Sequence, residues 1–186
     1  GGELTRALVL FQAVGNIRLV RVGKALMQLA LALRIPVGWA IRPTVYSHFC
    51  GGETIAECED TVATLANNQV HTILDYSAEG KEQEAELDRT HQRILEAIEA
   101  TQGDDRHGFS VFKVSGVAST ALLQKAAEHP DQLTDAETEA WDRVQARVDE
   151  LCSRAAALGT PIFIDAEETW LQGAIDALAL DQMRKH

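Results

Sequence analysis

Residues 161–169 read Pro-Ile-Phe-Ile-Asp-Ala-Glu-Glu-Thr, a short apolar run that ends in three carboxylates. The run comes directly after Gly159, which closes a long helical pattern. Its hydrophobicity is continuous and does not alternate, which is typical of a strand buried on both faces of a parallel sheet. This stretch therefore predicts an α/β protein.

Strand-like and helical patterns alternate on both sides of this stretch. Further strands are predicted at residues 70–76 and 109–114, and the apolar spacing predicts helices at residues 81–101, 119–128, 135–158 and 169–185. Strands separated by helices in this order are parallel and need crossover connections. A parallel sheet needs both faces covered. Three strands with this many amphipathic helices therefore indicate the first part of a larger barrel or of a doubly wound sheet.

The first 68 residues differ from the rest and predict a helical N-terminal arm. Residues 4–33 have the spacing of one or two helices, and residues 53–67 of another. Residues 4–52 contain six basic and no acidic side chains, whereas residues 53–186 contain 11 basic and 27 acidic ones. A basic amphipathic helix can lie on an anionic membrane or on a partner. The alternative, which the broad apolar face favours, is an arm packed on the rest of the protein.

Composition excludes several classes of protein. The chain has 186 residues, a net charge of −11 and 46% apolar residues, which suits one globular domain and argues against disorder or nucleic-acid binding. The uncharged run at residues 7–17 is shorter than the roughly 18 residues that a membrane span needs. His48, Cys50 and Cys58 lack the paired spacing of a zinc site, so we expect no metal and free thiols. No Rossmann, P-loop or nucleophile-elbow motif occurs.

Ionisable side chains stand at the end of each predicted strand. They are Asp75 and Glu79 after the first, Lys113 with Ser115 at the second, and Asp165, Glu167 and Glu168 after the third. In a parallel barrel, the carboxyl ends of the strands converge on one face. The sequence therefore predicts one pocket that collects these groups.

Lys113 is the most informative of them, because a lysine within an apolar strand is costly to bury without a carboxylate. Asp165 or Asp75 could provide that carboxylate. We interpret the set as a site for a small anionic substrate, with Lys113 attracting its carboxylate and Asp165 orienting Lys113. The alternatives are a structural ion pair and a Schiff-base lysine, and nearby carboxylates argue against the latter because they keep the amine protonated.

These segments resemble the proline dehydrogenase family. The resemblance lies in Glu3-Leu4-Thr5-Arg6-Ala7-Leu8, Tyr46-Ser47-His48-Phe49 with Gly52-Glu53, Ile73-Leu74-Asp75-Tyr76-Ser77-Ala78-Glu79, Phe112-Lys113-Val114-Ser115 and Ile164-Asp165-Ala166-Glu167-Glu168-Thr169. The resemblance implies a helical arm at residues 1–68, followed at 69–186 by the first three βα units of a (βα)8 barrel. It also implies FAD at the carboxyl ends of the strands and oxidation of L-proline to 1-pyrroline-5-carboxylate by hydride transfer to the flavin.

The resemblance assigns roles to individual residues. Lys113 matches the lysine that helps to bind the proline carboxylate, and Asp165 matches the aspartate that supports this site. Glu79 resembles a gating glutamate that pairs with an arginine absent from this sequence, and Asp75 begins the same motif. Most FAD contacts are expected beyond residue 186, with Asp165 and Glu167 as candidates within the chain.

The resemblance further implies a quinone as electron acceptor and peripheral contact with a membrane through the basic arm. The location is then the bacterial cytoplasm at the inner membrane, or alternatively the matrix side of the mitochondrial inner membrane. Five barrel strands have no counterpart here, and we expect them in the same chain or in another. A second hypothesis is a non-catalytic half-barrel that acts as an assembly module through its open strand edge.

Overall fold

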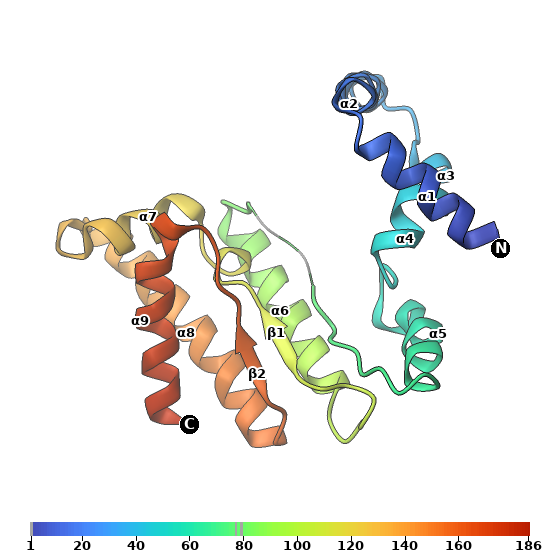
Figure 1. The fold of residues 1–186 in the computed structure, drawn as a ribbon. Coiled ribbons are helices and arrows are strands. Elements are labelled where there is room, and N and C mark those ends of the chain that lie inside the picture. Colours follow the sequence, from blue (N-terminus) through green and yellow to red (C-terminus); the bar gives the residue numbers. More distant parts are fainter. Residues whose placement is uncertain (1, 77, 79) are drawn as a thin grey trace. The chain divides into compact units, whose positions relative to one another are not determined.

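The computed structural model describes residues 2–76, 78 and 80–186 (Figure 1). The chain divides into two compact units, one that ends at Glu59 and one that begins at Asp60. Each unit is described by itself below.

The first unit is helical. Its elements are α1 (Gly2–Val14), α2 (Ile17–Ala32), α3 (Gly38–Ile41), a π-helical turn η1 (Arg42–Tyr46), α4 (Ser47–Phe49) and the start of α5 (Ile55–Ala66). The predicted helical region at residues 4–33 is confirmed as two helices. The break falls at Asn16, whose side-chain oxygen accepts hydrogen bonds from the N–H groups of Arg18 at 3.0 Å and Leu19 at 3.4 Å and so begins α2.

Aromatic rings join α1 to α4 within this unit. The ring of His48 lies 5.2 Å from that of Phe11 and 5.0 Å from that of Phe49, both edge-on. Many other apolar side chains of the arm are exposed, and α2 contains no buried residue. The exposed apolar side chains of α1 and α2 include Leu8, Val9, Phe11, Val14, Ile17, Leu19, Val22, Leu26, Leu29 and Leu31.

The second unit alternates helices with short strands. After α5 it contains α6 (Glu84–Ala100), β1 (Ser110–Phe112), a 3-10 turn η2 (Val114–Gly116), α7 (Thr120–Glu128), a 3-10 turn η3 (Pro130–Gln132), α8 (Asp135–Leu158), β2 (Ile162–Ile164) and α9 (Thr169–Lys185). The four helices predicted here are confirmed. In the described part of the chain, no helix is both long enough and apolar enough to cross a bilayer.

The sheet of the described residues has two parallel strands, with Ser110 opposite Ile162 and Phe112 opposite Ile164. The helices α7 and α8 form the crossover between them, so the α/β prediction is confirmed in this form. The predicted strand at residues 70–76 is wrong beyond one parallel bridge between Thr72 and His107. Among the described residues this segment gains no continuous partner strand, and its apolar side chains Val70, Ile73 and Tyr76 remain exposed.

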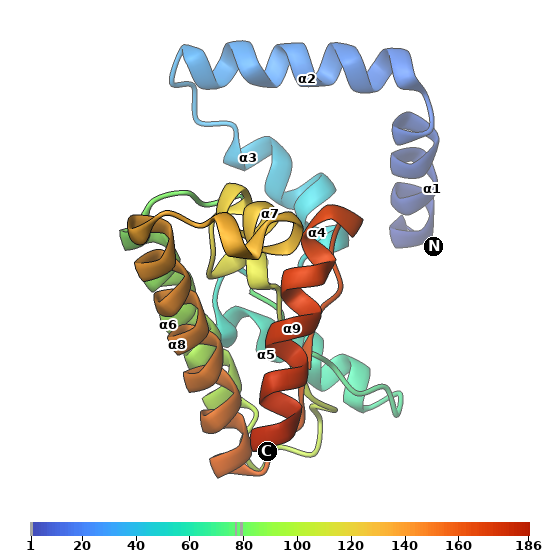
Figure 2. The same ribbon diagram turned by 90° about the vertical axis from the view of Figure 1, so that its left-hand side faces the viewer.

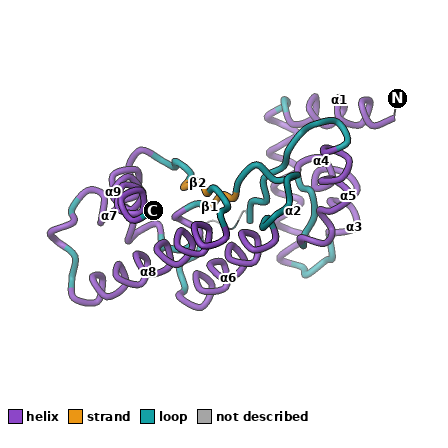
Figure 3. The backbone as a smooth tube through the Cα atoms, turned by 90° about the horizontal axis from the view of Figure 1, so that it is seen from below, coloured by secondary structure: helices purple, strands orange, loops and turns teal. Residues whose placement is uncertain are grey.

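One face of the sheet is covered by helices. Figure 3 shows α6 and α8 on one side of the two strands and α9 beside β2, and α6 packs along α8 while α7 packs on α9 (Figure 2). The core between strands and helices is made of apolar side chains from all of these elements: Ile94, Ile98, Phe112, Val114, Val117, Leu123, Val144, Val148, Leu151, Leu171, Ile175 and Leu178. Burial on this face fixes which strand residues point away from it.

The long helix α8 has strong signals at both ends. Thr134 accepts a hydrogen bond from the N–H of Glu137, and the Glu137 carboxylate accepts one from the N–H of Thr134, which completes a capping box. At the other end, Gly159 adopts the left-handed conformation with φ of 68°, which glycine reaches at little cost. The chain therefore turns into β2 directly after the helix.

Candidate functional site

Lys113 and Asp165 lie opposite each other just after β1 and β2. The N–H of Asp165 donates to the carbonyl of Phe112 at 3.0 Å, which continues the parallel ladder past its last paired residues. The Lys113 ammonium donates a hydrogen bond to the Asp165 carboxylate. Asp165, one of the two carboxylates predicted to compensate this lysine, therefore does pair with it.

The pleat of β1 explains why Lys113 points away from the core. Ser110, Phe112 and Val114 are buried on the helix-covered face, so Val111 and Lys113 project from the other face. Phe163, which is opposite Val111, is 51% exposed on that same face. The Lys113 side chain is 26% exposed and that of Asp165 is 44% exposed, so both groups are partly accessible to solvent.

Glu167 connects the end of β2 to the turn after β1. Its carboxylate accepts a hydrogen bond from the N–H of Ser115 at 3.0 Å. Its own N–H donates to the side-chain oxygen of Gln172 on α9 at 3.1 Å. The residue that was a candidate cofactor ligand is therefore already engaged in holding the two strand ends together.

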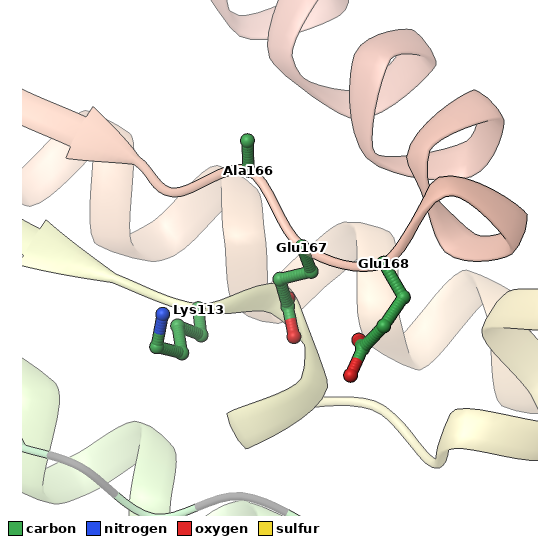
Figure 4. A pocket seen from close by; sticks show the side chains of 4 residues that line it. All are labelled: Lys113, Ala166, Glu167 and Glu168. Carbon is green, nitrogen blue, oxygen red and sulfur yellow. The ribbon is translucent and has the colours of Figure 1, made fainter.

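A shallow hollow of about 310 Å³ lies at this strand end, lined by Lys113, Ala166, Glu167 and Glu168 (Figure 4). In the close-up, the carboxylates of Glu167 and Glu168 both project from the segment after β2 toward the segment after β1. Its lining, as far as the structure describes it, thus combines the Lys113 cation with the flanking carboxylates of Glu167 and Glu168. Such a site can hold one carboxylate at Lys113 while it repels a more highly charged anion.

The structure brings some of the predicted site residues together and leaves others apart or undescribed. Lys113, Asp165, Glu167 and Glu168 come together as predicted. Asp75 is exposed in the extended segment after the Thr72 bridge, and it is not among the described residues that line the hollow. The predicted gating residue Glu79 lies outside the described residues.

Sequence reasoning missed Arg147, a buried arginine of α8 that contacts the backbone just after the turn η2. It is 6% exposed, and its guanidinium donates to the Val117 carbonyl at 3.1 Å, just after the turn η2. It also pairs with Glu84 and Asp88 of α6. A signal was present, because Arg147 lies three residues after Val144 and four before Leu151, on the apolar face of its helix.

The ion pairs of Arg147 with α6 also shift the pKa values of the groups involved. Partial burial opposes ionisation of Glu84, but the hydrogen bonds from Arg147 and Arg143 outweigh it and hold the pKa of Glu84 below its usual value. Burial likewise disfavours the charged form of Arg147, yet its bonds to Glu84 and Asp88 raise the pKa of the guanidinium. Both partners therefore stay charged throughout the physiological range.

The turn η2 is also packed tightly from the side of residue 78. A Cβ atom at Gly116 would lie 3.0 Å from the Ala78 carbonyl oxygen and 3.3 Å from Cγ2 of Thr90. A larger residue here would require Ala78 or Thr90 to move by a few tenths of an ångström. Gly116 thus permits the Ala78 carbonyl to lie close to the turn that follows Lys113.

The strand-end residues fit one part of a flavin dinucleotide and not another. Val111 and Phe163 on the open face offer apolar surface to a flat ring, and Lys113 offers a cation to a ring oxygen or a carboxylate. Glu167 and Glu168 do not suit a pyrophosphate, which is normally bound by N–H groups and cations. Within the described residues, the exposed face of the two strands next to Lys113 therefore suits the ring end of such a cofactor, and the hollow itself does not suit its pyrophosphate.

Comparison with known proteins relates this chain to proline dehydrogenases. The sequence profile of the proline dehydrogenase family matches residues 58–186. The carbapenem antibiotics biosynthesis protein CarD of Pectobacterium carotovorum subsp. carotovorum is 36% identical over 141 residues, which cover 76% of this chain and 37% of that protein. The mitochondrial proline dehydrogenase 1 of Arabidopsis thaliana is 23% identical over 176 residues, and that of Dictyostelium discoideum is 24% identical over 192 residues.

The matched part of the plant protein is 35% of its length and covers 75% of this chain, and for the Dictyostelium protein the figures are 34% and 84%. The chain therefore spans little more than a third of the curated relatives that it matches. The family profile covers the whole β1–β2 region and its helices, including Lys113 and Asp165. This chain belongs to the proline dehydrogenase family.

Proposed function

We propose that this chain forms part of an FAD-dependent proline dehydrogenase that oxidises L-proline to 1-pyrroline-5-carboxylate. The observation that carries the proposal is the Lys113–Asp165 pair, which stands at the open strand end within the matched region. A fixed cation beside an apolar face is what a small amino acid with one carboxylate requires. Family membership supports the reaction class.

The chain's own residues bind and orient the substrate in this proposal. Lys113 donates a hydrogen bond to the proline carboxylate, and Asp165 limits the positions that the ammonium can take. Val111 and Phe163 exclude water from the open face. FAD supplies the hydride acceptor for a hydrogen from the ring carbon, while the ring nitrogen loses a proton.

The two strands with helices on one face belong, in this proposal, to a (βα)8 barrel. The barrel's remaining strands come from sequence outside residues 1–186, in the same chain or in another. Residues 70–76 supply its first strand once a neighbour pairs with them, which brings Asp75 to the same end as Lys113. Glu79 closes the site through an arginine of that remaining part.

We further propose that a quinone accepts the electrons and that the arm lies on a membrane surface. Arg18, Arg21 and Lys24 are spaced three residues apart on α2, so they share one side of a helix whose apolar side chains are exposed. Such a helix suits anionic lipid. The corresponding location is the inner face of a bacterial membrane, or the matrix face of the inner membrane in mitochondria, which the names of several relatives mention.

A second candidate follows from the higher identity to the carbapenem biosynthesis protein than to the two mitochondrial enzymes compared above. The same ring oxidation would then serve the biosynthesis of an antibiotic. Both candidate functions use Lys113 in the same way, but one serves the breakdown of proline and the other the synthesis of an antibiotic. Deleting the gene and measuring both growth on proline and antibiotic production separates them. Loss of growth on proline alone supports the first candidate.

The deciding experiment is the visible spectrum of the purified protein that carries this chain, recorded anaerobically before and after addition of L-proline. A bound flavin bleaches when it accepts a hydride, so bleaching by L-proline and not by D-proline supports the proposal. A yellow protein that L-proline leaves unchanged overturns it. A colourless protein that associates with itself favours the assembly module, and irreversible trapping of a carbonyl substrate on Lys113 by borohydride favours a lyase.

A further inference from the structure

Two side chains from distant parts of the chain hold the turn η2, which begins directly after Lys113. Lys113 itself is in extended conformation and is the residue that leads into this turn. On one side, the Glu167 carboxylate accepts the N–H of Ser115 at 3.0 Å. On the other side, the Arg147 guanidinium donates to the carbonyl of Val117 at 3.1 Å.

Arg147 ties the turn to the helix behind it. Its Nη2 lies 2.6 Å from Oδ1 of Asp88, its Nε lies 3.0 Å from the same oxygen, and it also pairs with Glu84. A buried guanidinium needs several acceptors in fixed directions, so it tolerates little movement of any one of them. The Val117 carbonyl is one of these acceptors, and the turn is therefore fixed relative to α6.

Glu167 ties the same turn to β2 and α9. The hydrogen bond from its N–H to Gln172 fixes the backbone two residues after Asp165. Its carboxylate reaches across the strand ends to Ser115, a buried residue two positions after Lys113. Glu167 thus fixes the backbone two residues after Lys113 and two residues after Asp165.

We propose that Glu167 and Arg147 are positioning residues that clamp the turn η2 and so keep the Lys113 ammonium in place for a ligand carboxylate. Arg147 is not part of the hollow's lining, and Glu167, although it lines the hollow, has its carboxylate engaged by the Ser115 N–H. The identity of the ligand as L-proline rests on the proposed function, whereas the clamp itself does not. Displacement of a binding group by about 1 Å is enough to cost a large factor in catalytic efficiency.

The first test measures Lys113 without requiring catalysis. The rate of acetylation of Lys113, read by mass spectrometry in the complete protein, reports how firmly its ammonium is held. We expect Glu167→Ala to raise this rate roughly fivefold, in line with the loss of one hydrogen bond of ordinary strength. Glu167→Gln should give a rate closer to wild type than Glu167→Ala does, because its amide oxygen still accepts the Ser115 N–H although the hollow loses one negative charge.

Arg154 provides the matched control for Arg147. It also joins α8 to α6, through Glu99 at 2.7 Å, but it is exposed, and its hydrogen bond within the described residues goes to Glu99 and not to the turn. Arg147→Met should raise Lys113 acetylation by a similar factor, whereas Arg154→Met should leave it unchanged. If Arg147→Met does not fold by circular dichroism, the two Glu167 variants decide the question.

The second test measures the Michaelis constant for L-proline. We expect Glu167→Ala to raise KM roughly tenfold with a smaller fall in kcat, and Glu167→Gln to recover part of this loss in KM. Unchanged Lys113 acetylation in folded Glu167→Ala, or an equal rise in Arg154→Met, overturns the clamp. If the wild-type protein does not turn over L-proline, the proposed function fails, and the acetylation rates still decide whether the clamp exists.

Discussion

Lys113 and Asp165 face each other directly beyond the last paired residues of two parallel strands, and they are 52 residues apart in the sequence. The register of the strands alone brings them together, because Asp165 continues the ladder through the carbonyl of Phe112. An ion pair in this position is partly exposed, so its contribution to stability is small. Its value lies in presenting one oriented cation at the strand end.

Replacing Lys113 separates binding from folding. Lys113→Met should lower kcat/KM for L-proline roughly 10- to 100-fold, the effect of losing a hydrogen bond to a charged group, while the melting temperature changes little. Steady-state kinetics and a thermal melt check both expectations. Lys125→Met is the control. It removes a comparable ion pair, in which Lys125 Nζ lies 2.6 Å from a carboxylate oxygen of Glu137, and neither residue lines the hollow. Equal kinetic losses in the two variants would remove Lys113 from the site.

The capping box of α8 should dominate the stability of that helix end. Thr134→Ala removes the side chain that accepts the Glu137 N–H and should cost about 1 kcal/mol in the free energy of unfolding. Denaturant titration measures this loss. Thr138→Ala, one turn further along α8, is the control and should cost much less, because it lies within the helix and not at its cap.

The same helix end predicts a dependence on acid. Hydrogen bonds from Lys125 and then from Thr134 lower the pKa of Glu137 to about 2. Because the folded value lies below the unfolded one, the stabilisation is complete above about pH 4.5 and is lost as the pH falls toward 2. Glu137→Gln should therefore lower the melting temperature at pH 7 and have no such effect near pH 2. A difference that persists at pH 2 contradicts this assignment.

His91 should weaken the fold at mildly acidic pH. Its side chain is 12% exposed between α6 and α8, and its Nε2 atom lies 3.5 Å from a carboxylate oxygen of Glu150 without a hydrogen bond. Burial is the main cause that lowers the pKa of His91, and the Arg147 charge acts in the same direction, while Glu150 and Asp88 oppose them.

Because the folded pKa of His91 is lower than the unfolded value of 6.5, the unfolded state takes up a proton first as the pH falls. Stability should drop from pH 7 to pH 5 in the wild type and drop less in His91→Leu. Thermal melts over this range check the slope. His71→Leu, at an exposed position, is the control and should keep the wild-type slope.

The two neighbouring glycines before α5 should respond very differently to alanine. A Cβ atom at Gly52 would lie 2.7 Å from the Cβ of Glu57 and 2.9 Å from the Cys58 nitrogen, distances that require the backbone to move. At Gly51 the nearest atom, Sγ of Cys58, would be 3.4 Å away. Gly52→Ala should destabilise the first unit by about 1–3 kcal/mol, and Gly51→Ala by much less. Limited proteolysis near residues 50–60 compares them.

The basic side of α2 should control attachment to lipid. Arg18→Glu combined with Arg21→Glu should reduce binding to phosphatidylglycerol vesicles tenfold or more, since each basic residue near such a surface contributes about 1 kcal/mol. Cosedimentation with vesicles measures the loss. Arg89→Glu with Arg93→Glu makes the same charge change on the exposed side of α6 and should leave binding intact. Equal losses from both pairs would point to net charge and not to the arm.

Local patterns were enough to predict most of the elements. The apolar spacing of Leu87, Ile94 and Ile98 identified α6, and Gly159 followed by a continuous apolar run identified the end of α8 and the start of β2. The presence of ionisable groups at the ends of these strands, together with the register of parallel strands, also predicted that Lys113 and Asp165 meet. These features depend on neighbours along the chain or on one rule of sheet geometry.

Only the tertiary structure decided the rest. Whether residues 70–76 become a strand depends on a partner strand, and in the described residues they gain a single bridge at Thr72. The roles of Glu167 and Arg147 depend on contacts with Ser115, 52 residues away, and with Val117 and Glu84, 30 and 63 residues away. Periodicity reports which side of an element is apolar, but the acceptor that a buried guanidinium or carboxylate reaches is fixed only when helices and strands pack together.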